Sequence, residues 1–562
     1  MTHTTAKRMS PLALAVSIVL AMAMMLTGCS SRNSDADSVS NEDAKTQTFT
    51  PENGKSSATL NIASGSENKE VADAVQQAVN DSGVSVTLNY MGSLDIMQAL
   101  QRGGDSYDAV WPASSMWISM GDTKHVVKEQ SSTSTTPIVF GITQSKAVEL
   151  GWADSNGTTK PVSTQDLIAA VQSGKLTFSM TSATQSNSGA SAYLAFLTAL
   201  AGKNQALTAD DLNNTTLQTN AKTLLSGVDR SSGSSDWLKD MVVADPERFE
   251  SMVNYESLVI AADKELTKAG KDPLLAVYPS DGIAVSDSPL GYVDRGQHLD
   301  DAYSKFAKAL TSKDSKLLFE RAGRRTGLGG TLAYASDSKV KEAFRAEWGI
   351  TTGSDALKTI PLPAANVINQ ALDVYQRNLR KPSWTVWVVD YSGSMYGDGK
   401  TGVVDGLNAA LEPTQAAQSM IEPGDSDVNI LVPFNSVATQ GPKATGTQTS
   451  QLLSEARETE ADGGTNIYDG LRMALADNMP NDPNQYTTAI VLMTDGVSET
   501  DDKESFLDTY KSNSFKPPIF SIMFGEADPS QLNDLASLSN AKVFDGRKGN
   551  LASVFRQVKG YN

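Results

Sequence analysis

Apolar residues near the start of the folded part of the chain form short runs that alternate with longer amphipathic segments. In residues 93–102, for example, Leu94, Met97 and Leu100 lie on one side of a predicted helix. The pattern predicts strands at residues 60–63, 84–90 and 107–111, and helices at 67–80 and 93–102. Alternation of strand, helix and strand is typical of a parallel α/β sheet with helices on both faces.

The alternation continues through the middle of the chain. It predicts strands at residues 137–142, 177–180, 258–261 and 275–278, and helices at 164–173, 192–200 and 248–254. Either Ser163 or Thr164 is expected to cap the helix at 164–173, because a hydroxyl there can accept a hydrogen bond from the first turn.

Another α/β unit begins near residue 360, where Pro361 and Pro363 mark a boundary. A helix with apolar residues on one face follows and stops at Pro382. Strands of almost unbroken apolar character are predicted at residues 384–389, 429–432, 489–493 and 519–524, with helices at 403–411, 467–477, 529–538 and 551–558. Such strands are typical of parallel sheets buried on both faces, so the pattern predicts a second doubly wound unit.

The first 28 residues have the pattern of an export signal, with Lys7 and Arg8 ahead of the apolar run 11–26. The run ends in Leu-Thr-Gly before Cys29, which resembles the lipobox of bacterial lipoproteins. The resemblance implies lipidation of Cys29, a membrane anchor and a body on the extracellular face. The alternative is an uncleaved anchor helix with an accidental cysteine. The polar segment that follows is expected to be a flexible tether.

Composition narrows the possible functions. The chain has 562 residues, enough for several domains, and its 47 Lys and Arg against 65 Asp and Glu give a net charge of −18. Nucleic-acid-binding proteins usually carry an excess of Lys and Arg, and this acidic chain has no such excess. One Cys rules out an intrachain disulfide, and three His leave few ligands for a zinc site.

Oxygen-bearing side chains follow the predicted strands of the C-terminal unit. Asp390, Ser392 and Ser394 come directly after residues 384–389, Thr465 precedes the helix at 467–477, and Asp495 follows residues 489–493. Sites in open α/β sheets form where loops leave the C-terminal ends of strands. Hard oxygen ligands of this kind suit Mg²⁺ or Mn²⁺ better than zinc. Taken singly, each piece is equally typical of a helix cap or turn.

In this order, the three pieces resemble the von Willebrand factor A domain with its metal-ion-dependent adhesion site, over residues 364–562. The resemblance implies that Ser392, Ser394 and Thr465 ligate the metal directly, while Asp390 and Asp495 act mostly through water. Asp495 is the least secure of the five placements, because two other aspartates lie near it in the sequence. The implied cofactor is Mg²⁺, with Mn²⁺ or Ca²⁺ as alternatives. The implied partner is a protein that fills the open coordination position with an exposed Asp or Glu.

Residues 57–350 resemble the two-lobed solute-binding proteins of bacterial ABC transporters, of the oxyanion-binding type. The resemblance places a ligand between the lobes, against loops rich in Ser and Gly at helix starts. The residues implied are Ser64, Gly65, Ser66, Ser114, Ser115, Ser188, Gly189 and Ala190. The alternative is that these residues only cap helices. Residues 137–142 are expected to cross to the second lobe and residues 281–285 to return.

Other side chains in this region are also candidates for the cleft. Trp111, Trp117 and Tyr255 could line the cleft, but core positions are expected for them. Arg324 and Arg325 could face an anion, but a solvated helix end is expected.

The sequence therefore predicts an α/β protein with a two-lobed, periplasmic-binding-protein-like unit followed by a doubly wound, Rossmann-like A domain. The expected boundaries are a signal peptide at 1–28, a tether at 29–56, the two-lobed unit at 57–355, a connecting helix at 356–381 and the A domain at 382–562. We expect a surface lipoprotein that binds an acidic protein partner through its metal. The alternative is a solute receptor of an ABC transporter with an accessory A domain. No nucleophile with its base stands out, so no enzymatic activity is expected.

Overall fold

The computed structural model describes residues 46–353, 357–498, 502–525, 527–547 and 551–561. The predicted signal peptide, Cys29 and the first part of the predicted tether lie outside the described residues. From residue 45 onward the chain forms one compact unit. Within the described ranges, no helix has both the length and the apolar character that crossing a membrane requires.

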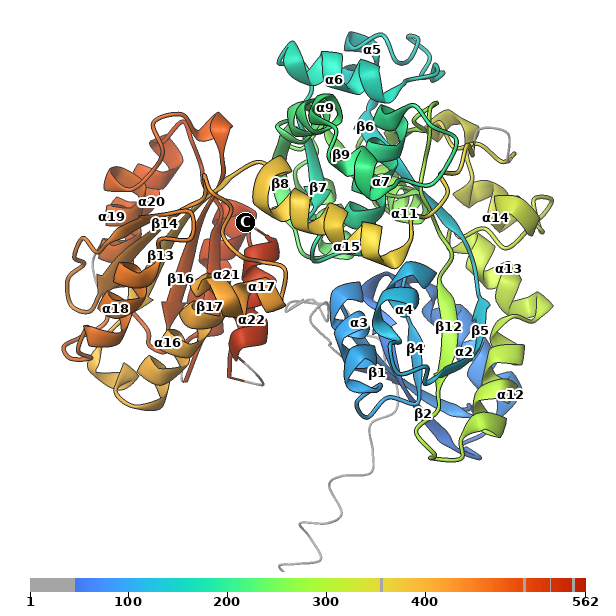
Figure 1. Cartoon of the computed structure of the whole chain (residues 1–562), viewed down its shortest axis with the longest axis horizontal. Helices are drawn as coiled ribbons and strands as arrows, with labels where there is room; N and C mark the ends of the chain where they lie inside the picture. The colour runs from blue at the N-terminus through green and yellow to red at the C-terminus, as the bar shows by residue number, and fades with distance from the viewer. Residues whose placement is uncertain (1–45, 354–356, 499–501, 526, 548–550, 562) are drawn as a thin grey trace, which may run out of the picture. The chain divides into compact units, whose positions relative to one another are not determined.

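A first lobe is built on a mixed sheet with the strand order β1-β3-β2-β4-β12-β5 (Figure 1). Its strands are β1 (Thr46–Phe49), β2 (Thr59–Gly65), β3 (Ser85–Met91), β4 (Ala109–Trp111), β5 (Val127–Ser132) and β12 (Pro289–Val293). Its helices are η2 (Ser66–Val71), α2 (Ala72–Ser82), α3 (Ser93–Arg102), α4 (Ser115–Gly121), α12 (Asp300–Leu310) and α13 (Lys313–Arg321). Apolar side chains of α2, α12 and α13 cover one face of the sheet, and those of α3 and α4 pack on the other.

The predicted tether differs from the structure at its end. Thr46–Phe49 forms β1, which pairs antiparallel with β3 at the edge of the sheet. Phe49 is buried in the core of the first lobe. A single large apolar residue at the end of a polar segment was too weak a signal to predict a strand.

The second lobe contains a sheet with the order β10-β6-β9-β7-β8, and β11 pairs with β6. Its strands are β6 (Thr136–Thr143), β7 (Phe178–Thr181), β8 (Val228–Ser232), β9 (Ser251–Tyr255), β10 (Leu274–Val277) and β11 (Val285–Ser286). Its helices are α5 (Gln144–Glu149), α6 (Thr164–Gln172), α7 (Asn187–Ala201), α8 (Ala209–Leu212), α9 (Thr215–Leu225), α10 (Ser235–Ala244) and α11 (Glu256–Lys268). Ser163 caps α6 with a capping box. Short elements η3 (Leu328–Gly330), α14 (Ser338–Ala343) and η4 (Ala346–Trp348) follow α13.

The chain passes between the two lobes at both of the predicted places. It leaves the first lobe after β5 and enters β6, and it returns from β11 into β12. After α13 the chain passes to the second lobe once more, because Val340, Phe344 and Trp348 pack in the core of that lobe. Repeated crossing of this kind is the arrangement of a two-lobed unit.

One predicted helix and one predicted strand were wrong. Residues 251–255 form the buried strand β9, where a helix was expected, and residues 258–261 lie inside helix α11, where a strand was expected. The run from Leu258 to Ile260 is buried throughout, so it shows no period that distinguishes a buried helix from a buried strand.

The C-terminal unit is a sheet with the order β15-β14-β13-β16-β17-β18, parallel except for β15. Its strands are β13 (Ser383–Asp390), β14 (Val428–Phe434), β15 (Lys443–Thr445), β16 (Thr487–Thr494), β17 (Ile519–Met523) and β18 (Val543–Asp545). Its helical elements are η6 (Gly393–Met395), α16 (Asp398–Leu411), α17 (Pro413–Gln418), α18 (Ser450–Glu458), α19 (Ile467–Asp477), η7 (Pro483–Gln485), α20 (Asp502–Ser512), α21 (Pro529–Ser539) and α22 (Leu551–Gly560).

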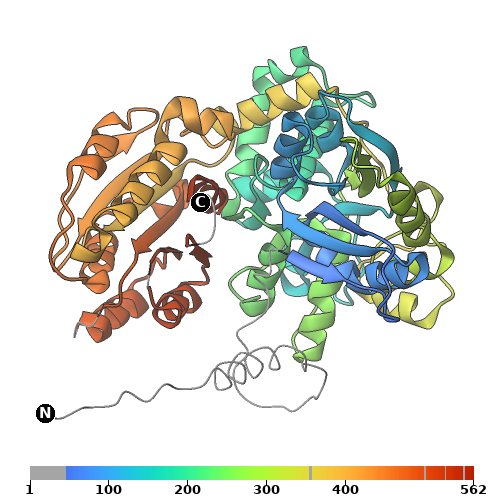
Figure 2. The ribbon, with the colours of Figure 1, turned by 90° about the horizontal axis from the view of Figure 1, so that it is seen from below.

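Helices cover both faces of this sheet (Figure 2). The apolar side chains of α16, α18 and α22 pack on one face and those of α19, α20 and α21 on the other. Alternate residues of β13 supply the two cores, with Trp387 facing the first and Val388 the second. Burial on both faces explains why the sequence of this strand is apolar almost throughout.

Helix α15 (Ala365–Val374) and the π-helical turn η5 (Tyr375–Leu379) connect the two-lobed unit to β13. Figure 1 shows α15 in yellow beside the two lobes. The helix contacts α4 of the first lobe and both α7 and α8 of the second. Its apolar residues Ile368, Ala371 and Leu372 belong to a core cluster that contains residues of both lobes.

Two glycines let α16 pack closely on the C-terminal helix α22. A Cβ atom at Gly406 would lie 2.2 Å from the Phe555 ring, and one at Gly402 would lie 2.5 Å from Leu551. The Phe555 ring is itself stacked on Trp387 of β13, with ring centroids 6.0 Å apart. It therefore cannot retreat without disturbing the core.

We expect Gly406→Ala to destabilise the protein by about 1–3 kcal/mol, the usual cost of forcing extra volume into a packed core. Urea unfolding should show a lower midpoint for this variant, and the double variant Gly406→Ala/Phe555→Leu should recover part of the loss. Asp405→Ala, at an exposed position of the same helix, is the control. Equal midpoints for Gly406→Ala and the control would contradict this account of the packing.

Candidate functional site

Three loops meet at the carboxyl end of the central strands of the C-terminal sheet. Asp390 is the last residue of β13, and Asp495 follows the last residue of β16. The loop before α19 is tied to the first by two backbone hydrogen bonds: Gly393 N–H donates to Gly463 O at 3.1 Å, and Asp462 N–H donates to Tyr391 O at 2.9 Å. Parallel register places these loops side by side, because β13 pairs with β16 residue for residue.

The predicted hydroxyls and carboxylates form one hydrogen-bonded chain. Ser392 Oγ and Ser394 Oγ lie 3.1 Å apart, and Ser394 Oγ donates to Asp495 Oδ1 at 2.7 Å. Asp390 Oδ1 accepts a hydrogen bond from Ser392 N–H at 2.7 Å, and Asp390 Oδ2 accepts one from Thr494 Oγ1 at 2.6 Å.

Thr465 completes the group. A Cβ atom at Gly496 would lie 3.0 Å from Thr465 Oγ1, so the threonine hydroxyl lies directly against the residue after Asp495. The structure thus brings together Asp390, Ser392, Ser394, Thr465 and Asp495. Of the two competing aspartates, Asp502 accepts a hydrogen bond from Asn466 Nδ2 at 2.9 Å, and Asp501 lies outside the described residues.

The group runs from a buried base to an open surface. Asp390 and Ser392 are buried, Thr465 and Asp495 are half-buried, and Ser394 is exposed. Burial raises the pKa of Asp390; hydrogen bonds from Thr494 and Ser392 act against this, and nearby Asp495 adds to it.

The donor set fits a hard divalent cation. It offers two carboxylates and three hydroxyls, all oxygen, which is the chemistry that Mg²⁺ prefers. No group of three or more His, Cys, Asp or Glu converges on a metal position within the part of the chain that the structure describes. A cation held here would therefore depend on the three hydroxyls and on water as well as on the two carboxylates.

The loops of this site carry exposed apolar side chains that sequence reasoning missed. Tyr396 is 83% exposed, Val437 is 60% exposed and Val497 is 45% exposed. Val437 belongs to the loop after β14, which joins the site where Gly464 N–H donates to Ser436 Oγ at 2.8 Å. The position of these three apolar residues next to the polar loop motifs could have indicated a contact surface. An isolated apolar residue in a loop is common, however, so the signal was weak.

The predicted solute-binding residues Ser64, Gly65 and Ser66 differ from one another in burial and in the groups they contact. Ser64 is fully buried and accepts a hydrogen bond from Asn68 Nδ2 at 3.0 Å. At Gly65, a Cβ atom would lie 2.1 Å from Glu67 Oε1, so the carboxylate folds back over the glycine. Ser66 begins η2 and is half-buried.

The other predicted solute residues serve helix starts and packing. Ser114 Oγ caps α4 by accepting from Met116 N–H, and Ser115 N–H donates to Asp287. On α7, Ser188 Oγ bonds the Thr181 and Ser235 hydroxyls, both at 2.7 Å. A Cβ atom at Gly189 would lie 2.1 Å from Thr181 O, so the glycine allows α7 to pack against β7, and Ala190 is buried in the core.

Polar groups without a partner gather on η2, which lies against α10 of the second lobe. Among the described residues, Glu67 Oε1, Asn68 Oδ1 and both carboxylate oxygens of Glu70 are buried without a hydrogen bond. Burial raises the pKa of Glu67, and it raises the pKa of Glu70 to about 8, with Asp236 adding to the effect. Sequence reasoning missed these residues because acidic residues at a helix start have an ordinary role there.

The expectation for the two arginines was wrong, because both are fully buried. Arg324 donates to Glu67 O at 2.7 Å and to Ser288 Oγ at 3.0 Å. Arg325 forms a two-pronged ion pair with Glu256, with both N–O distances at 2.8 Å. Two consecutive arginines after a helix do not reveal from sequence that buried acceptors elsewhere in the protein will bind them.

The three aromatic residues are core residues, as expected, and each also makes a hydrogen bond. Trp111 Nε1 donates to Thr133 Oγ1 at 3.1 Å. Trp117 of the first lobe donates to Asn187 Oδ1 of the second at 2.8 Å, and Asn187 Nδ2 donates to the Tyr255 hydroxyl at 3.0 Å. Asn187 is thus a polar link between the lobes.

Family models match two parts of the chain. Residues 60–325 match the family described as bacterial extracellular solute-binding protein, and residues 386–557 match the family described as von Willebrand factor type A domain. The chain joins a solute-binding-protein domain to a von Willebrand factor type A domain. We call them the solute-binding domain and the A domain. No curated protein matches the chain.

Solved structures resemble the two domains in fold. For the solute-binding domain they include the periplasmic binding protein AfuA from Actinobacillus pleuropneumoniae, at 13% identity and a TM-score of 0.42, covering 57% of this chain and 98% of that one. The sulfate-binding protein SubI from Mycobacterium tuberculosis is 18% identical, with a TM-score of 0.37 and coverage of 55% and 93%. A von Willebrand factor type A protein from Catenulispora acidiphila is 20% identical, with a TM-score of 0.27 and coverage of 32% and 42%.

Proposed function

We propose that the A domain binds a divalent cation, Mg²⁺ or alternatively Mn²⁺ or Ca²⁺, and uses it to capture an acidic protein partner. The observation that supports this is the convergence of three hydroxyls and two carboxylates at one sheet edge, with Ser394 exposed at its opening. Ser392, Ser394 and Thr465 would contact the cation. Asp390, which the backbone N–H of Ser392 already orients, would hold water molecules of the cation. Asp495 would do the same and would also orient the Ser394 hydroxyl, which already donates a hydrogen bond to it.

The charge of the site favours an acidic partner. The proposed direct ligands are three neutral hydroxyls, and the two carboxylates that balance the divalent charge would act through water, so the cation stays electrophilic toward an incoming carboxylate. Tyr396, Val437 and Val497 would then contact apolar groups beside that carboxylate, because they are the exposed apolar residues of the same loops. The proposed partner therefore presents an Asp or Glu next to apolar side chains.

We expect Ser392→Ala and Asp390→Ala to lower Mg²⁺ affinity at least tenfold in calorimetric titration of the full-length protein. The first removes a hydroxyl of the set, and the second removes a charge and its hydrogen bonds. Removing a group that orients a metal ligand typically lowers metal affinity about 10–100-fold. Asp398→Ala is the matched control, because Asp398 is an exposed carboxylate on the helix that follows the site.

The same variants separate metal binding from partner capture. Immobilised peptides with an Asp or Glu between apolar residues should be retained only with metal present, and their Asn or Gln counterparts should not. Tyr396→Ala should weaken peptide capture while leaving Mg²⁺ affinity unchanged. Unaltered metal affinity in both site variants would place the metal elsewhere, and capture that survives EDTA would separate the partner from the metal.

A second candidate function is that of a solute receptor for an ABC transporter, with the A domain as an accessory. The family match over residues 60–325 supports it. The sequence favoured an oxyanion as the solute, but the hydroxyls of Ser64 and Ser188 already have partners inside the protein. The free acceptors of Glu67, Asn68 and Glu70 instead favour a solute that brings hydrogen-bond donors, such as an amine or a polyol.

Calorimetry of the full-length protein against amines, polyols, sulfate and phosphate tests this choice. We expect binding of a donor-rich solute and at least a tenfold loss of affinity in Glu67→Gln, which keeps the shape but removes the carboxylate. Glu52→Gln, at an exposed position of the same lobe, is the control. Binding of sulfate or phosphate alone, unaffected by Glu67→Gln, would restore the oxyanion assignment.

We further propose that the protein is exported and held at the extracellular face of the membrane by lipidation of Cys29. The support is the match to an extracellular family and the single cysteine of the chain after Leu-Thr-Gly. Several acyl chains on one residue would anchor a protein durably. Cys29→Ser should move the protein from the membrane fraction to the soluble fraction or leave its precursor uncut. Ser31→Ala is the control, and unchanged anchoring and cleavage in Cys29→Ser would refute the anchor.

We propose that both sites bind ligands without catalysing a reaction. Among the described residues, neither His125 nor His298 lies in the loops that carry the metal-site hydroxyls. The Ser392 and Ser394 hydroxyls are bonded to each other, and Ser394 donates to Asp495, a carboxylate that a cation would engage.

A further inference from the structure

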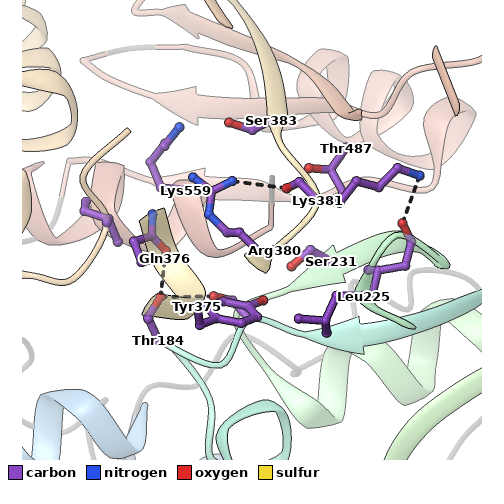
Figure 3. Close-up of a pocket in the computed structure, with 13 residues that line it drawn as sticks. Thr184, Leu225, Ser231, Tyr375, Gln376, Arg380, Lys381, Ser383, Thr487 and Lys559 are labelled. Atoms are coloured by element: carbon purple, nitrogen blue, oxygen red, sulfur yellow. Dashed lines mark hydrogen bonds between the residues drawn. The ribbon is translucent and has the colours of Figure 1, made fainter. Parts of the chain in front are cut away.

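A small cavity lies at the amino end of the A-domain sheet, away from the candidate metal site (Figure 3). Its volume is about 30 Å³. Ser383 and Thr487 line it at the first residues of β13 and β16, and the metal-site loops leave the opposite ends of these strands. Eight residues of strand separate the two ends by roughly 23 Å.

Both domains and the connecting segment contribute to the wall. Figure 3 shows Lys559, Arg380 and Ser383 along one side, with Thr184 and Leu225 of the solute-binding domain on the other. The connecting turn η5 supplies further lining through Tyr375 and Gln376.

Positive charge exceeds negative charge around the cavity. Arg380 is paired with Asp427, whose two oxygens also accept hydrogen bonds from the backbone N–H groups of Ser383 and Gly424. Burial acts to raise the pKa of Asp427, but Arg380 outweighs it and holds that pKa below its ordinary value. This carboxylate is therefore ionised and has its hydrogen-bonding capacity filled.

The two lysines differ in their partners. Lys381 donates to Val228 O at 3.1 Å; burial lowers the pKa of Lys381, and Asp229 acts against this. Lys559 is only 7% exposed, and its Nζ has no hydrogen-bond partner among the described residues. Burial lowers the pKa of Lys559 to about 8; Asp427 acts against this, and Arg380 adds to it.

A second donor lacks a partner at the same wall. Ser383 is 1% exposed, and within the described part of the chain its hydroxyl makes no hydrogen bond. A buried ammonium group and a buried hydroxyl without partners are costly, and native proteins usually satisfy such groups with a ligand or water.

We propose that this cavity is a binding site for a small inorganic anion, held by Lys559 and Ser383 where the solute-binding domain meets the A domain. Arg380 is paired with Asp427 and Lys381 donates to a backbone carbonyl, so one anion would supply the partner that Lys559 Nζ lacks among the described residues. The cavity holds about two water-sized groups, which suits chloride or phosphate and excludes larger organic anions. Because the wall comes from both domains, the bound anion would hold them together.

Thermal unfolding of the full-length protein in detergent and EDTA tests the site. Chloride or phosphate should raise the unfolding midpoint at constant ionic strength, and gluconate, which is too large for the cavity, should not. Comparison of the midpoint in chloride with the midpoint in phosphate shows whether the site prefers a halide or an oxyanion. Lys559→Met should lower the apparent anion affinity at least tenfold, and Ser383→Ala should lower it less, because it removes a hydroxyl without removing a charge. Lys268→Met removes an exposed lysine and is the control.

Crystals soaked in bromide, a heavier stand-in for chloride, should show anomalous density beside Lys559 Nζ. An anion response that persists in both Lys559→Met and Ser383→Ala would overturn the proposal, as would equal effects of gluconate and chloride. Absence of bromide from the cavity, together with an unchanged midpoint in chloride and phosphate, would leave water as the partner of the lysine and refute the anion site.

Discussion

The position of β13 between β14 and β16 determines where polar groups can gather in the A domain. All three strands are parallel and buried on both faces, so their sides admit little but apolar residues. Polar side chains are confined to the two ends. At the carboxyl end they form the oxygen cluster around Asp390, and at the amino end they form the charged group around Asp427. A metal and an anion are thus proposed at opposite ends of one apolar layer.

The solute-binding domain meets the same constraint in another way. Its two sheets are joined where buried polar residues from both lobes meet, and most of those residues are satisfied inside the protein. Arg325 with Glu256 and Trp117 with Asn187 are examples. Against this background the unpartnered acceptors of η2 stand out. The chemistry of the site is therefore better indicated by unpaired atoms than by a count of serines.

The sequence predicted the fold more fully than it predicted the sites. Amphipathic helices such as α3, and strands that are apolar throughout such as β13, carry a periodic signal in their own residues. The error at residues 251–261 arose where a helix is buried all round and its period disappears. The metal-site residues could be located because motif and strand end coincide. The surroundings of Arg324, Glu67 and Lys559 are formed by residues more than a hundred positions away in the chain, and no local pattern encodes these.

Helix α15 touches α4 of one lobe and α7 and α8 of the other, and then leads through η5 into the first strand of the A domain. Two-lobed binding proteins release their contents by a hinge motion. In this chain the lobes cannot swing apart while α15 keeps its contacts with both. Because α15 is also the linker to the A domain, movement of the lobes and movement of the linker are coupled. Opening the lobes would pull on the amino end of β13, a central strand of the A-domain sheet, and holding that strand fixed would hold the lobes shut.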